Sequence, residues 1–208
     1  MTRVTYTPLD VPYVECDGDT IKRYMDKRSS RTDYSWTEDI DQPWNHVIVR
    51  SPRVPVLEDE IPGSGWRPDF KRLFPTVVSA VESLPYTSIS YVYLFEQVIP
   101  VKPHYDHVGK NSNTHLEPAS YRITLLMEDE EAFYICNDTE CSTYTHPRYP
   151  TDTNTWAFSN ETRPHGSLMP KQGKRKILLI VGGGVLNENV HNELLNRSIA
   201  KYSDYVIK

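Results

Sequence analysis

Short apolar runs, separated by turn residues rather than by helical segments, fill the middle and the second half of this chain. They are rich in β-branched and aromatic residues, which favour a pleated and half-buried strand. A parallel sheet needs a crossover helix between successive strands, so this succession disfavours a parallel α/β fold and predicts a mainly β fold of antiparallel strands, as in a jelly roll. The candidate strands are Ile89–Ile99, Tyr121–Met127, Ala132–Cys136, Ser142–Thr145, Thr153–Ser159 and Lys174–Val181.

Two amphipathic segments are expected to pack beside these strands. Apolar residues recur at helical spacing over Phe70–Pro85 and form one stripe, so this helix should back the sheet. Asp69 suits the N-cap position of this helix, and the terminal Leu-Pro pair closes it. A second helix is predicted over Leu186–Ile199, after a run of three glycines. His191 lies on the second helix, and we assign it a structural or surface role.

The chain has 208 residues and is expected to form a single domain, because nothing in its composition marks a second one. Residues 1–65 are rich in Pro, Tyr, Asp and Arg, and we predict an irregular extension of short strands and loops with a short helix at Asp19–Lys27. This extension either lines a substrate site or only covers an open face of the sheet. Residues 66–184 should form the core with its backing helix, and residues 185–208 the C-terminal helix and tail.

Charge and cysteine content restrict the classes of partner. The net charge is -5 and the basic residues are scattered, which makes a nucleic-acid partner improbable. The sequence contains neither a long apolar segment nor a secretory signal, so we expect a cytoplasmic protein with no membrane partner. Sparse cysteines fit a reducing compartment, and we expect Cys136 and Cys141 to be free thiols on either side of a turn rather than a disulfide or a metal pair.

A cluster of potential metal ligands lies at the ends of two candidate strands. Side chains alternate along a strand, so His104 and Asp106 should point to one side and Tyr105 to the other. His165 follows much later, between two other apolar runs. Two histidines and one carboxylate can bind one face of Fe(II) and leave three positions open for a chelating substrate and O₂. We therefore predict a facial triad of these three residues.

A chelating 2-oxo acid would also need a fixed cation for its far carboxylate. Arg175 is the preferred candidate, because guanidinium binds carboxylate through two hydrogen bonds. Alternation gives Arg175 the same face as Ile177 and Leu179, whereas Lys174 and Lys176 should face the opposite side. Arg122 either contacts the chelating end of such an acid or belongs to an internal ion pair.

The same residues resemble the Fe(II)/2-oxoglutarate-dependent oxygenases, whose double-stranded β-helix carries His-x-Asp, a distal histidine and a basic residue about ten positions beyond it. More narrowly, residues 66–184 are similar to the aspartyl/asparaginyl β-hydroxylase-like branch, in which a helix ending in Leu-Pro and a strand with Tyr-Arg flank the first ligands. Two departures are Asp106, which vertebrate members of that branch lack, and Thr124, where the branch often has histidine.

The resemblance implies an oxygenase that uses Fe(II), O₂ and 2-oxoglutarate as co-substrate. We expect hydroxylation of an amino acid or of a peptide or protein side chain, with succinate and CO₂ as products, and desaturation or cyclisation as open outcomes. Arg163, Asn160 and Tyr105 are candidate substrate contacts, although Arg163 and Asn160 suit loop-bracing equally well. A zinc-dependent hydrolase would leave Arg175 without a role, and a non-catalytic cupin-like binding protein would not need the triad together with this cation.

Overall fold

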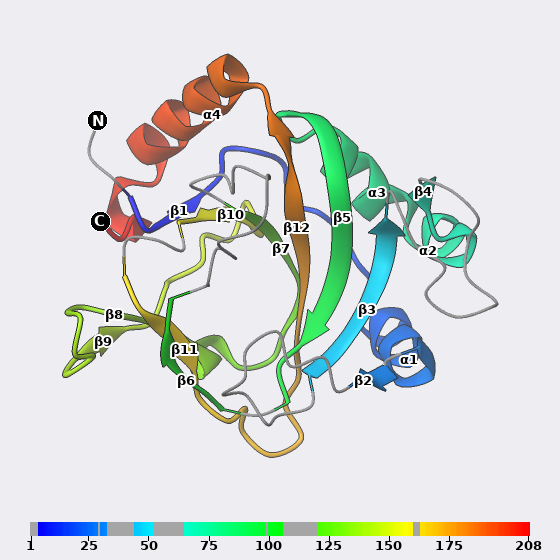
Figure 1. Ribbon diagram of the computed structural model, residues 1–208, viewed down its shortest axis with the longest axis horizontal. Coiled ribbons are helices and arrows are strands. Elements are labelled where there is room, and N and C mark those ends of the chain that lie inside the picture. Colours follow the sequence, from blue (N-terminus) through cyan, green and yellow to red (C-terminus); the bar gives the residue numbers. More distant parts are fainter. Residues whose placement is uncertain are drawn as a thin grey trace.

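The computed structural model of the protein has a mainly β fold, in which two antiparallel sheets are accompanied by a few helices (Figure 1). This arrangement confirms the mainly β, antiparallel prediction and is compatible with a jelly roll. The structure describes residues 4–28, 30–32, 44–51, 65–98, 100–105, 120–159 and 163–208.

The larger sheet has eight strands, all paired antiparallel with their described neighbours. Its central members are the long apolar runs predicted from the sequence. In spatial order the strands are β1 (Tyr6–Pro8), β10 (Thr155–Phe158), β7 (Ser120–Met127), β12 (Lys176–Leu186), β5 (Tyr86–Glu96), β3 (Trp44–Ser51) and β2 (Ser30–Thr32), with β4 (Gly65–Trp66) paired to β3.

The smaller sheet has four strands and closes the other side of the molecule (Figure 1). In spatial order they are β6 (Val101–His104), β11 (His165–Ser167), β8 (Phe133–Cys136) and β9 (Tyr144–Thr145). Between β5 and β12 the chain changes sheet at every connection except the β8–β9 hairpin. Residues far apart in the sequence therefore meet between the two sheets.

Helices cover the outer face of the larger sheet, on the side away from the smaller one (Figure 1). They are α1 (Gly18–Arg28), α2 (Pro68–Leu73) and α3 (Pro75–Glu82). Their apolar side chains form one cluster with alternate residues of the central strands, among them Ile21, Phe70, Val77, Leu94, Ile177 and Leu179. The last helix, α4 (Glu188–Lys201), lies beside β1, near the C-terminus.

A second apolar cluster lies between the two sheets and is largely aromatic. Because side chains alternate along β12, Leu178 and Ile180 point into this cluster while Ile177 and Leu179 pack under the helices. The other buried members are Tyr6, Phe133, Ile135, Trp156 and Phe158. Both faces of β12 are thus apolar, which explains why the strand reads as a continuous hydrophobic run.

The backing helix differs from its prediction. The stripe over Phe70–Pro85 is divided between α2 and α3, because Pro75 has no N–H and disfavours helical backbone at the residue before it. Phe74 accordingly has φ -129° and ψ 55°. The N-cap of α2 is Arg67, and Asp69 lies in the first turn of the helix rather than at its cap. The C-terminal helix, α4, is present as predicted.

The cysteine prediction is wrong, because Cys136 and Cys141 form a disulfide. The turn between β8 and β9 brings their Cα atoms to 4.8 Å, which is within the range of natural disulfides. Ser142 and Thr143 belong to this turn, so β9 is shorter than expected. Sparse cysteine usage therefore gives no support for a reducing compartment. In the part of the chain that the structure describes, each helix is too short or too polar to cross a bilayer.

Candidate metal and anion site

The two predicted histidine ligands face each other across neighbouring strands. His104 ends β6, His165 begins β11, and their Cα atoms are direct partners in the smaller sheet. Their ring centroids lie 4.5 Å apart at an interplanar angle of 46°. His165 is 4% exposed, and its ring packs on Phe158 at 4.7 Å and on Phe133 at 5.9 Å between centroids. His165 is therefore buried in the interior between the sheets, with the half-buried His104 beside it.

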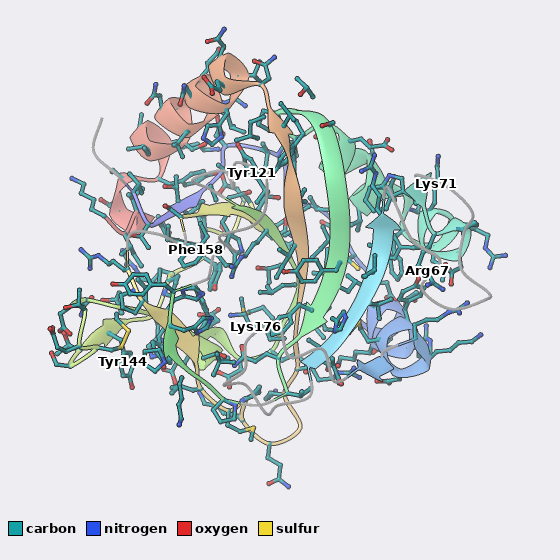
Figure 2. All side chains as sticks on the ribbon, in the orientation of Figure 1. Arg67, Lys71, Tyr121, Tyr144, Phe158 and Lys176 are labelled. Carbon is teal, nitrogen blue, oxygen red and sulfur yellow. A yellow bond between two sulfur atoms is a disulfide. The ribbon has the colours of Figure 1, made fainter. Side chains whose placement is uncertain are left out.

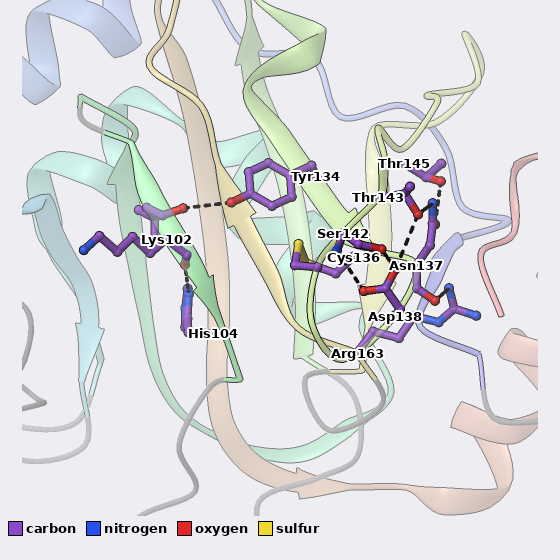
Figure 3. Close-up of a disulfide and its surroundings, with 12 residues drawn as sticks. Lys102, His104, Tyr134, Cys136, Asn137, Asp138, Ser142, Thr143, Thr145 and Arg163 are labelled. Atoms are coloured by element: carbon purple, nitrogen blue, oxygen red, sulfur yellow. Dashed lines mark hydrogen bonds between the residues drawn. A yellow bond between two sulfur atoms is a disulfide. The ribbon is translucent and has the colours of Figure 1, made fainter.

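The hydrogen bond of His104 determines which of its ring nitrogens carries the proton. Its Nδ1 lies 2.8 Å from the carbonyl oxygen of Lys102 (Figure 3). A carbonyl only accepts, so Nδ1 carries the proton and Nε2 keeps its lone pair. Metal-binding histidines commonly show this arrangement, in which a backbone carbonyl fixes the ring and its tautomer.

The spacing of the two rings also suits one shared metal. Two imidazoles bound at about 2.1 Å to adjacent positions of one ion would place their centroids roughly 4.5 Å apart. Asp106, the third predicted ligand, lies outside the described residues, two positions after His104. Within the described ranges, no group of three His, Cys, Asp or Glu residues is arranged to hold a metal. The pair of histidines fits a metal with two nitrogen donors, and the prediction for Asp106 stays a prediction.

Two buried cations come from the larger sheet into the same interior. Arg122 on β7 is 8% exposed, and its guanidinium lies 4.7 Å from the ring centroid of Phe158. Lys176 on β12 is 1% exposed, and its Nζ lies 5.4 Å from the ring centroid of Phe133. Phe133 and Phe158 also contact His165, so the same aromatic rings connect the cations with the histidines. Figure 2 shows Lys176 and Phe158 within the ring of strands.

Lys176 is in an environment that disfavours its charge. Burial lowers the pKa of Lys176 to about 7, and the charge of Arg122 contributes in the same direction. The carboxylates of Asp129 and Glu130 oppose this shift only in part. The Nζ atom lies 3.5 Å from the hydroxyl of Tyr149, and no carboxylate among the described residues is within ion-pair distance of it. A small carboxylate bound here would stabilise the ammonium form of Lys176.

Arg175 lies on the helix-covered side of the larger sheet, opposite to Lys176. It precedes β12 and forms ion pairs with Glu96 at 2.5 Å and with Asp26 of α1 at 2.8 Å. Its backbone N–H also donates to Glu128. Strand alternation is as the sequence predicts, but the face that Arg175 shares with the odd-numbered residues is the helix-covered one. Lys176 faces the side opposite to Arg175, as expected, and that side is the interior between the two sheets.

Sequence reasoning missed Lys176 because both faces of its strand are apolar. Ile177 and Leu179 on one side resemble Leu178 and Ile180 on the other, so hydrophobicity does not tell which face is internal to the two sheets. The sequence did contain one signal for Lys176, namely its positive charge. Lys176 alternates with apolar residues along the strand as strictly as Arg175 does.

The weaker candidates are spread around the site. Tyr105 follows His104 and is 39% exposed, as alternation predicts. Arg163 donates to the carbonyl of Asn137 at 3.5 Å, so its described contact is with the β8–β9 turn. Asn160 lies outside the described residues.

Comparison with known proteins adds little to this picture. No protein-family model matches the chain, and no curated protein matches it. A solved structure with a similar chain path is the crystal structure of an oxidoreductase of the 2OG-Fe(II) oxygenase family from Burkholderia pseudomallei. The match covers 83% of this chain and 81% of that chain, at 11% sequence identity and a TM-score of 0.44.

Proposed function

We propose that this protein is a non-haem Fe(II)/2-oxoglutarate-dependent dioxygenase built on a double-stranded β-helix. One observation carries the proposal: His165, which pairs with His104 in the smaller sheet, and a buried Lys–Arg pair from the larger sheet contact the same aromatic side chains. The alternation of strands β5 to β12 between two sheets supports the fold assignment. Metal ligands beside a carboxylate-binding cation are what an oxygenase with a 2-oxo acid co-substrate requires.

His104 and His165 would hold the metal, with Asp106 as the proposed third ligand. We assign the co-substrate carboxylate to Lys176, with Arg122 beside it, in place of Arg175. Bound Fe(II) would supply the activation of O₂ and the oxidative decarboxylation of 2-oxoglutarate to succinate and CO₂.

The side chains of the protein would position the reactants and exclude water. The Lys102 carbonyl keeps His104 in the tautomer with an unprotonated Nε2. Lys176 and Arg122 would bind and orient the anionic end of the co-substrate, where low polarity strengthens their attraction for a carboxylate. Phe133 and Phe158 separate these charges from solvent.

The substrate class is proposed from the resemblance to the aspartyl/asparaginyl β-hydroxylases. We propose an amino acid or a peptide or protein side chain as substrate, with hydroxylation as the reaction. Arg163, Asn160 and Tyr105 remain proposed substrate contacts, and an extended peptide would pass over the exposed Tyr105.

The proposal is tested by adding Fe(II) and then 2-oxoglutarate to the metal-free protein under anaerobic conditions. We expect a visible charge-transfer band that requires both additions. His165→Ala should abolish the band, and Lys176→Met should weaken 2-oxoglutarate binding at least about tenfold. His146→Ala is the matched control, because His146 binds the carbonyl of Phe133 from outside the proposed ligand set. A wild-type protein that stays folded and gives no band would exclude this function.

A further inference from the structure

The strands that carry the two histidines are joined by an irregular pairing. His165 pairs with His104, but Ser167 pairs with Val101, so one residue of β11 faces two residues of β6. Such a bulge changes the direction of the side chains that follow it and is common beside active sites. The orientation of His104 relative to His165 therefore depends on this bulge being maintained.

The single residue opposite the bulge is Gly166, and no side chain fits there. A Cβ atom at Gly166 would lie 2.5 Å from the carbonyl oxygen of Val101 and 2.4 Å from the hydroxyl oxygen of Tyr134. Both distances are far below a normal contact. The phenol of Tyr134 thus lies directly over the Gly166 backbone, in the space that any other residue would occupy.

Tyr134 spans three strands of the smaller sheet. It belongs to β8, where its Cα pairs with Gly166 of β11, and its hydroxyl donates a hydrogen bond of 3.3 Å to Val101 on β6 (Figure 3). The side chain is 6% exposed. Its neighbours Phe133 and Ile135 point into the interior, so Tyr134 lies on the opposite face of the sheet and does not touch the proposed metal position.

The strand that carries Tyr134 is itself firmly held. The N–H of Cys136 donates to the carbonyl of Pro164 at 2.9 Å, immediately before His165. Cys136 is also bonded to Cys141 across the hairpin turn (Figure 3). Tyr134 consequently projects from a fixed strand toward the bulged one.

We propose that Tyr134 is a positioning residue for the candidate metal centre. Its phenol crosses Gly166 to the Val101 carbonyl and holds β6 in the bulged register that sets His104 opposite His165. The inference rests on the proposed function only in assigning these histidines to a metal. The packing of the hydroxyl against Gly166 exists whatever the metal is.

Tyr134→Phe tests the proposal, because it removes the hydroxyl and keeps the ring. We expect the affinity of the metal-free protein for Co(II), used as a spectroscopic substitute, to fall about tenfold, as for other residues that orient metal ligands. The urea midpoint of the metal-free protein should change little. Tyr144→Phe is the control: its ring packs against Tyr134 at 4.7 Å between centroids, but the residue is 47% exposed. Equal Co(II) affinities in the two variants would overturn the proposal.

A second readout does not require the metal to bind. The imidazole NMR signals of His104 and His165 in the metal-free protein should shift in Tyr134→Phe and stay in place in Tyr144→Phe. Unchanged signals in Tyr134→Phe would overturn the positioning role. Absence of Co(II) binding by the wild type, with the signals still responding to Tyr134→Phe, would instead reject the proposed function and retain the positioning role.

Gly166→Ala provides an independent variant. Its Cβ would meet the backbone oxygen of Val101, which moves only if β6 moves, so we expect a larger loss of Co(II) affinity than in Tyr134→Phe. Gly65→Ala is the matched control, since a Cβ there has no heavy atom within 4 Å. Wild-type affinity in a folded Gly166→Ala protein would contradict the proposed dependence of His104 on this contact.

Discussion

Replacing Lys176 by Met should stabilise the protein and remove its proposed co-substrate binding at the same time. The pKa of Lys176 is about 7 in the folded protein, against an ordinary value of 10.5. This difference corresponds to roughly 5 kcal/mol between the two protonation states, with unpaired burial of the ammonium as its main cause. Met has a similar length and no charge. We expect it to raise the free energy of unfolding at neutral pH by about 1–4 kcal/mol, as for other buried charged groups replaced by apolar residues.

The pH dependence has a definite sign. The unfolded chain binds a proton at Lys176 below about pH 10.5, whereas the folded protein binds it only below about pH 7. Between these values the unfolded state holds more protons, so the contribution of Lys176 to the free energy of unfolding increases as the pH rises. The destabilisation caused by burying Lys176 is therefore small above about pH 10.5 and grows as the pH falls toward 7. The difference in stability between Lys176→Met and the wild type should therefore be largest near neutral pH and shrink toward alkaline pH.

Urea unfolding at several pH values measures the stability, and the thermal shift caused by 2-oxoglutarate measures binding. A ligand at 100 times its dissociation constant stabilises the folded state by about 2.7 kcal/mol, so its loss in Lys176→Met is easily detected. Lys174→Met is the control, because Lys174 is exposed. A destabilised Lys176→Met protein, or one that 2-oxoglutarate stabilises as it does the wild type, would refute the reasoning.

Other perturbations address the contacts around the site. Arg175→Ala should lower the free energy of unfolding by about 1–3 kcal/mol, because buried Glu96 loses its cationic partner. Calorimetry should show unchanged 2-oxoglutarate affinity, and a tenfold loss would return the anchoring role to Arg175. Burial lowers the pKa of His191, so the free energy of unfolding should fall as the pH drops below about 6.5. Acid unfolding followed by circular dichroism should show a weaker pH dependence of stability in His191→Gln, and an equal pH dependence in the two proteins would be the contrary result. Reduction of Cys136–Cys141 opens a short loop and should cost about 2 kcal/mol, measured by thermal unfolding with and without reductant; an unchanged midpoint would contradict this.

The features that follow from local periodicity were predictable from the sequence. The mainly β fold was one of them, because the apolar runs alternate with turns rather than with helices. The position of α4 was another, since its stripe is uninterrupted. The placement of His104 and His165 at strand ends was a third, because each follows or precedes an apolar run. In these cases the information lies within a few neighbouring residues.

The remaining features depend on how segments meet in three dimensions. The disulfide required the turn that brings Cys136 to Cys141, and the division of the backing helix depended on the outcome of a competition between the apolar stripe and Pro75. The bulge opposite Gly166 has no sequence pattern that distinguishes it from regular pairing. The face of β12 that meets the smaller sheet is a property of the assembled sheets, and two equally apolar faces conceal it.

In strand β12, the number of residues matters more than the identity of each aliphatic residue. Each of its residues from Lys176 to Val181 belongs in turn to the helix-packed layer or to the interior of the proposed site. Exchanging one aliphatic residue for another would change little. Deleting a single residue within the strand would move every strand residue on one side of the deletion to the opposite face of the sheet. Insertions and deletions should therefore be tolerated in the loop before Arg175 and excluded from the strand itself. A deep mutational scan with single-residue deletions would show this boundary as an abrupt loss of folded protein.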